Sequence, residues 1–392
     1  MPASPASPQD TQERWRLVRG HLNQHRYDLT ELAVQEPAEG QVIPGTRLIA
    51  RRHWIPESPV PLERVQLNWQ GDAPAVPIDG SGPELDGTRP LRDDGTSYTY
   101  YADAVGDLAR PRLFENRSCY RLLDVRTGQD GPTLTFGRGH YFDVINICEA
   151  AAHEFAAATL STSGEAVPHP DLTPFRSAVG DPTDLARRPV MAATSTLTIR
   201  HDRRKGTAEF VLHWRDPDKV ASGGGLYQVM PVGMFQSSHD ASWNEANDFD
   251  LWRSIARELS EELLGDSEDY GSATAPIDYA AWPLMKSLDQ ARQDGTLHVY
   301  WLGLGMDPLT FVTDMLTVAV FDSELFDDTF RKIVATNDEG HRVQMEDGSG
   351  HAVGIPFRAD QIDRLTRNEP MQPAGAALLR LAWQHRDALL RI

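Results

Sequence analysis

The sequence predicts an α/β sandwich in its carboxy-terminal half, preceded by an amino-terminal α+β domain. Downstream of residue 190, β-favouring runs and helical periodicity follow one another in the order strand, strand, helix, strands, helix, which is typical of a sheet covered by helices. Upstream, residues 167–189 contain five prolines and little periodicity. Because such segments commonly separate domains, we place the boundary near residue 175.

Composition excludes several classes of protein. The 392 residues are enough for two domains, and 40% of them are hydrophobic, which supports ordinary buried cores. A net charge of −19 argues against binding nucleic acid through its phosphates. Cys119 and Cys148 have no zinc-ligand or disulfide-framework spacing. Without a signal-peptide pattern or a long apolar run, we expect a cytoplasmic protein that binds no membrane.

The amino-terminal half carries no motif with a nameable chemistry. We expect a partly disordered, partly helical segment over residues 1–30 and an α+β domain of unknown role over 31–170. Helical spacing over 13–29, extended segments over 47–52 and 54–62, a loop over 71–95, a hairpin over 120–136 and a helix from Phe142 support this. Its aromatic runs suit either a ligand pocket or an ordinary core. We expect a specificity or dimerisation module, which leaves a homodimer open.

The carboxy-terminal half, residues 175–392, has the clearer pattern. Strands are expected over 194–200, 208–214, 226–230, 297–302, 316–321 and 353–357. Helices are expected over 249–264, 359–365 and 374–390. The first of these helices begins at Asp248 or Asp250 and ends at Gly265, since acidic residues favour helix starts and glycine favours helix ends.

Three carboxylates share one side of the helix expected over 249–264. Glu258, Glu261 and Glu262 stand at i, i+3 and i+4, while the apolar residues follow a different stripe. Oxygen-only ligands on one face suit Mg²⁺ or Mn²⁺. The alternative is an ordinary acidic surface on which Arg257 pairs with Glu261.

The same helix carries a family resemblance. Gly233 after a strand, followed by Arg257-Glu258-Leu259-Ser260-Glu261-Glu262, resembles the box of the Nudix hydrolase superfamily. The likeness covers about residues 190–392 and includes the runs 212–215 and 353–357. Compared with the family pattern, the spacer after Gly233 is longer and Gly265 comes one residue later, so the box is atypical and expanded. Glu245, Asp248 and Asp250 are all candidates for the acid of that spacer.

The resemblance implies a Nudix-like α/β/α sandwich with a mixed sheet and a metal-dependent hydrolase. Its substrate would be a small, phosphorylated, nucleotide-like molecule with a diphosphate bond, and its cofactor Mg²⁺ or Mn²⁺. By position, Glu258, Glu261 and Glu262 would hold the metal, Arg257 would orient the carboxylates, and Gly233 would permit close packing. Glu261, Glu262 and Arg257 are the expected catalytic residues.

Three questions stay open at this point. The general base is either Glu261 or a later acid; Glu346 is the favoured extra metal ligand and Glu339 the next, although ordinary surface charge is the preferred interpretation of both. The leading alternative function is a weak or inactive Nudix-like domain that acts as a ligand sensor or assembly module. A third possible function is transfer or isomerisation on a diphosphate-bearing metabolite, which no residue of the sequence specifically indicates.

Overall fold

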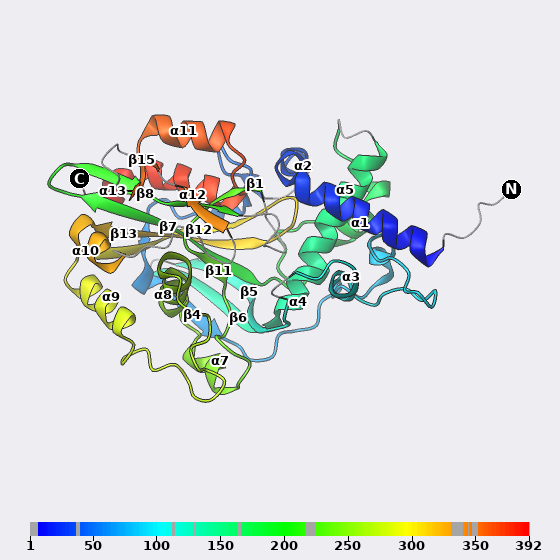
Figure 1. Cartoon of the computed structure of the whole chain (residues 1–392), viewed down its shortest axis with the longest axis horizontal. Helices are drawn as coiled ribbons and strands as arrows, with labels where there is room; N and C mark the ends of the chain where they lie inside the picture. The colour runs from blue at the N-terminus through cyan, green and yellow to red at the C-terminus, as the bar shows by residue number, and fades with distance from the viewer. Residues whose placement is uncertain are drawn as a thin grey trace.

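The computed structural model describes residues 7–36, 40–111, 114–128, 130–162, 166–215, 225–330, 340–343, 345–346 and 352–391. The described helices are α1 (Pro8–Gln24), α2 (Arg26–Ala33), α3 (Tyr101–Leu108), α4 (Tyr141–Val144), α5 (Ala150–Ser161), α6 (Pro174–Val179), α7 (Trp243–Asn247), α8 (Leu251–Leu259), α9 (Pro283–Gln293), α10 (Ser323–Thr329), α11 (Ala359–Asn368), α12 (Pro373–Gln384) and α13 (Arg386–Leu390). In Figure 1, α1, α2, α3 and α5 form one end of the molecule and the largest sheet forms the other.

The described strands are given in chain order, first up to β9 and then from β10 onward. The first group is β1 (Gln41–Val42), β2 (Ile49–Ala50), β3 (Val60–Pro61), β4 (Gln66–Trp69), β5 (Ser118–Gly128), β6 (Gly131–His140), β7 (Ala192–Asp202), β8 (Thr207–Phe210) and β9 (Leu212–Arg215). The second is β10 (Tyr227–Val229), β11 (Val232–Met234), β12 (Leu297–Met306), β13 (Thr313–Asp322), β14 (Gly340–Val343), β15 (Met345–Glu346), β16 (Ala352–Val353) and β17 (Ile355–Pro356).

The largest sheet confirms the α/β class and the mixed sheet. Its strand order is β1-β2-β12-β13-β7-β8-β17, with β11 added on β7 and β3 on β12. Strand β13 runs parallel to β7, whereas β12 and β13 are antiparallel. Helix α12 packs on β7, β12 and β13 from one side, and α8 and α9 cover the other (Figure 1). Helices therefore enclose a core that includes Leu197, Leu304 and Val318.

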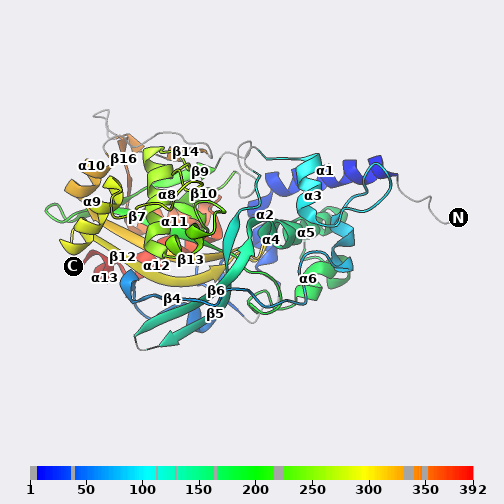
Figure 2. The same ribbon diagram turned by 90° about the horizontal axis from the view of Figure 1, so that it is seen from below.

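The sheet also takes strands from the amino-terminal part of the chain. Val60 and Pro61 pair with Trp301 and Tyr300, and Ile49 pairs with Met306. The expected boundary near residue 175 is thus not a boundary of the sheet, because residues 41–61 complete its β12 side. The amino-terminal half keeps a sheet of its own, β4-β6-β5, which includes the expected hairpin (Figure 2).

The carboxylate-bearing helix has the ends that its sequence predicts. The side chain of Asp250 accepts a hydrogen bond from the backbone N–H of Arg253 at 2.9 Å, which caps the first turn of α8. Gly265 ends the helix in the left-handed region, with φ of 73°. Trp252, Ile255 and their apolar neighbours are buried against the sheet, which fixes one face of the helix, and the carboxylates of the other face line a cavity.

The described part of the chain holds no helix that is both long and apolar enough to cross a bilayer.

Candidate functional site

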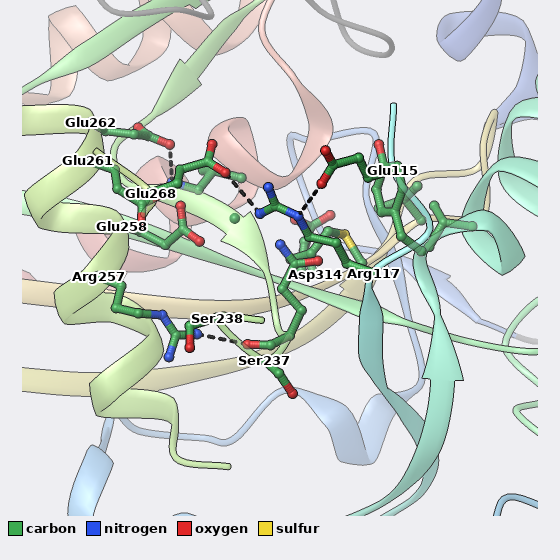
Figure 3. A pocket seen from close by; sticks show the side chains of 18 of the residues that line it. Glu115, Arg117, Ser237, Ser238, Arg257, Glu258, Glu261, Glu262, Glu268 and Asp314 are labelled. Carbon is green, nitrogen blue, oxygen red and sulfur yellow. Dashed lines mark hydrogen bonds and ion pairs between the residues drawn. The ribbon is translucent and has the colours of Figure 1, made fainter. Parts of the chain in front are cut away.

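A cavity of about 1370 Å³ lies between the two halves of the molecule. The carboxy-terminal half contributes β11, the loop 236–240, the acidic helix face and the loop 265–273. The amino-terminal half contributes, among others, Phe114, Glu115, Arg117 and Tyr141 near β5 and the buried pair Arg26 and Glu149. Figure 3 shows the helix carboxylates on one wall and Arg117 and Glu115 opposite them. The half without a recognisable motif therefore forms part of the same cavity.

The helix that carries the carboxylates changes its winding where they stand. After α8, residues Ser260–Leu264 form a π-helical turn, in which the N–H of Gly265 bonds to the carbonyl of Ser260. A π turn holds one more residue than an α turn. Gly265 therefore follows a turn that is one residue longer than an α turn. The extra residue leaves Glu258, Glu261 and Glu262 lining the same cavity.

Two of the three glutamates lie against β11. The carboxylate of Glu258 occupies the space where a Cβ at residue 233 would stand, so only glycine fits there without displacing it. The carboxylate of Glu262 accepts a hydrogen bond from the backbone N–H of Val232 at 3.0 Å. Strand β11 thus positions both acids.

Glu261 has a different environment. Its carboxylate accepts a hydrogen bond from the hydroxyl of Tyr270 at 2.8 Å. Burial raises the pKa of Glu261 to about 7, helped by the negative charge of Glu268 and opposed by the Tyr270 hydrogen bond and by the charges of Arg257 and Arg117. A carboxylate with a pKa near neutrality has the acid–base strength that suits a general base.

Arg257 points away from the carboxylates that it was expected to orient. It donates to the hydroxyl of Tyr279 at 2.5 Å and to the carbonyl of Gln236 at 2.8 Å, and its ion pair is with Asp248 rather than Glu261. Asp248 is fully buried and also accepts from Tyr279 and from the N–H of Ser238. Arg257 therefore ties the helix to the loop after β11, and its effect on Glu258 is through charge and position.

The structure gives different roles to the three candidate acids of the long spacer. Asp248 pairs with Arg257, whereas Asp250 caps α8. Glu245 forms a two-oxygen ion pair with Arg138 of β6, at 2.5 and 2.9 Å. The additional spacer residues form α7 and connect the acidic helix to the amino-terminal hairpin.

The cavity is strongly acidic. Its acidic lining residues are Glu115, Glu149, Asp240, Glu258, Glu261, Glu262, Asp266, Glu268, Asp269, Asp307 and Asp314, against Arg26, Arg117 and Arg257. Arg26 is paired with Glu149 and Arg257 with Asp248, both deep in the protein. A phosphorylated ligand would therefore need cations to enter, and the oxygen donors suit Mg²⁺ or Mn²⁺.

The carboxylates do not converge as a ready metal centre. Among the described residues, no three acidic, histidine or cysteine side chains lie close enough together to hold an ion. Glu258 and Glu262 share the β11 wall, but Glu261 is turned to Tyr270. Carboxylate oxygens are suitable ligands for a hard cation. For all three glutamates to bind one ion, however, Glu261 would have to give up its hydrogen bond from Tyr270 and turn to the ion. Glu346 lies in β15, but its side chain is outside what is described, as is all of Glu339.

Several cavity residues were not anticipated from the sequence. Asp314, on β13, accepts a hydrogen bond from Ser195 at 2.8 Å on the cavity side of the sheet. Glu268 and Tyr270 follow Gly265, where the acidic run 266–269 could have marked them. Arg117 had no sequence signal, because only the fold brings it to this helix.

A scan against protein-family models gives no match to this chain, and a search of curated proteins gives none of significance.

Proposed function

We propose that the protein is a Mg²⁺- or Mn²⁺-dependent hydrolase that cleaves the diphosphate bond of a small, nucleotide-like substrate. Residues 190–392 would form a Nudix-like α/β/α sandwich. The observation that carries the proposal is the joint placement of Glu258 against Gly233 and of Glu262 on the N–H of Val232, at the wall of an acidic cavity. The spacing of the box residues is the basis of the resemblance, and these two contacts are a physical reason for a glycine at 233 and for glutamates at 258 and 262.

The roles follow from the environments of the three glutamates. Glu258 and Glu262 would hold the cation, which supplies the positive charge that draws phosphate oxygens into an acidic cavity and acidifies a bound water. Glu261, whose pKa is near 7, would accept a proton or join the cation when Tyr270 releases it. Arg257 holds the helix in place through Asp248.

The direct test is turnover by the full-length protein. Release of phosphate or nucleoside monophosphate from a panel of nucleoside diphosphate derivatives is measured with and without Mg²⁺. We expect metal-dependent turnover, and a loss of kcat of roughly 10²- to 10⁴-fold in Glu261→Gln, the range for removal of a general acid–base. Glu324→Gln, on the exposed start of α10, is the matched control and retains wild-type kcat. Full activity in Glu261→Gln would remove the catalytic assignment.

A second candidate function rests on a separate observation. Glu261 and Glu262 both have hydrogen-bond partners within the protein, Tyr270 and the Val232 N–H, and no three-carboxylate centre is formed among the described residues. That arrangement favours a ligand sensor or assembly module that retains the helix without turnover. Tight binding of the same panel with no cleavage under any metal condition would favour sensing over hydrolysis.

A further inference from the structure

The amino-terminal half contributes one cation whose position in the cavity is unlike that of the others. Arg26 and Arg257 have side chains that are only 3% and 5% exposed, and each is paired with a buried carboxylate. Arg117 lies just before β5, and its side chain is 31% exposed. Among the arginines that line the described cavity, it is the one that a dissolved ligand reaches.

The partners of Arg117 come from both sides of the cavity. Its Nε bonds to Glu115 at 3.2 Å, and its Nη1 bonds across the cavity to Glu268 at 2.9 Å (Figure 3). Both carboxylates are well exposed. Ion pairs of this exposed kind contribute little to stability, so a doubly charged ligand competes with them at small cost. The guanidinium fork also matches the oxygens of a phosphate.

Arg117 is also close to the expected metal-binding face. Arg117 lines the same cavity as Glu258, Glu261 and Glu262 and lies on the wall opposite them (Figure 3). A diphosphate that contacts cations on the Glu258–Glu262 wall therefore has a guanidinium within the same cavity for its remaining charge. The surrounding acids repel that charge, which makes a specific anchor necessary.

We propose that Arg117 is the phosphate anchor of this cavity: it releases Glu115 and Glu268 and binds the diphosphate of the ligand opposite the carboxylate helix. This inference rests on the proposed diphosphate ligand but not on its hydrolysis. The amino-terminal half then completes the binding site, and Glu115 and Glu268 are the internal competitors that occupy the anchor in the ligand-free protein.

The test is calorimetric binding of methylenediphosphonate, a diphosphate mimic that resists hydrolysis, to the full-length protein with Mg²⁺. Arg117→Ala is expected to weaken binding at least tenfold, and Arg117→Lys to recover part of the loss. Glu268→Gln and Glu115→Gln are expected to bind about two- to fivefold more tightly, because each removes a competitor. Arg126→Ala, an exposed arginine further along β5 that pairs with Asp124, is the matched control and leaves affinity unchanged.

The signs of these effects separate an anchor from a structural bridge. If the bridge were only structural, Arg117→Ala and Glu268→Gln would change affinity in the same direction, which would overturn the proposal. Equal affinity of Arg117→Ala and wild type, or no binding by wild type, would overturn it too. Binding without cleavage of any diphosphate in the separate turnover assay would refute hydrolysis while supporting the anchor.

Discussion

Two buried arginine networks contribute residues to the cavity, and they differ in how many structural elements they join. Beside the carboxylate helix, Arg257 is matched by the single acid Asp248. In the amino-terminal half, Arg19 of α1 and Arg26 of α2 both bond to Glu149, at 3.3 and 2.7 Å.

A histidine adds to the amino-terminal network. Tyr101 donates to or accepts from Nδ1 of His153 at 2.9 Å, beside Arg19. Burial lowers the pKa of His153 to about 3, and the charge of Arg19 adds to this. The first network is thus a single compensated ion pair beside a proposed reaction centre, whereas the second joins α1, α2, α3 and α5 around Glu149. In both networks the arginines are buried and hold the elements around the cavity together. Phosphate binding is therefore assigned to Arg117, which is accessible.

The largest expected effect comes from removing one acid of each network. Asp248→Asn and Glu149→Gln are each expected to lower the free energy of unfolding by about 3–5 kcal/mol, because each leaves a buried guanidinium without its counter-charge. Urea denaturation measures this. The two variants are expected to differ in cation binding. Mn²⁺ affinity should fall in folded Asp248→Asn, because Asp248 holds the loop after β11 against the carboxylate helix, and it should stay at the wild-type value in Glu149→Gln. Equal Mn²⁺ affinity in the two variants would refute the view that Asp248 supports the cation site whereas Glu149 supports only the fold.

The next effect is a pH dependence that belongs to the amino-terminal network. The pKa of His153 is lowered on folding, so its contribution to stability is present above its unfolded pKa of about 6.5 and is lost as the pH falls towards 3. Between pH 7 and pH 5 the loss is about 2 kcal/mol for this group. Unfolding curves of wild type and His153→Asn should therefore converge as the pH is lowered through this window. A constant gap between them would mean that His153 titrates alike in both states.

The smallest effect probes strand β11, beside which the proposed metal ligands lie. Gly233→Ala places a Cβ in the space of the Glu258 carboxylate, which must then turn away from β11. We expect about a tenfold loss of Mn²⁺ affinity, comparable to losing the support of one ligand. Gly87→Ala, where nothing lies within 4 Å of the added Cβ, controls for the substitution itself. Unchanged Mn²⁺ binding in Gly233→Ala would show that Glu258 does not bind the ion from its present position.

Sequence periodicity predicted the elements that have strong local signals. The α8 helix, its Asp250 cap and its Gly265 stop follow from residues within one short window, and the long strands β7, β12 and β13 follow from continuous β-favouring runs. The placement of strands β1 to β3 on the same sheet did not follow, because their pairing with β12 joins distant segments.

The site divides in the same way. The spacing of Glu258, Glu261 and Glu262 identified one wall of the cavity, but the pairing of Arg257 with Asp248 depends on how the long spacer folds back. The i, i+4 spacing allowed a surface pair between Arg257 and Glu261 as the alternative to a metal site. The buried guanidinium instead pairs with Asp248, a fully buried acid that also accepts hydrogen bonds from Tyr279 and Ser238. Arg117 was beyond reach, since no local pattern relates it to the helix opposite.

The pairing of Pro61 with Tyr300 joins residues about 240 positions apart, and such distant contacts slow folding because a large loop must close first. Until residues 297–306 emerge from the ribosome, β3 lacks its partner in this sheet and β2 can pair only with β1, and β12 in turn would expose its edge if they were missing. The cavity between the halves is therefore expected to form late in biogenesis, and a chaperone that shields the first sixty residues would affect its yield more than its final stability.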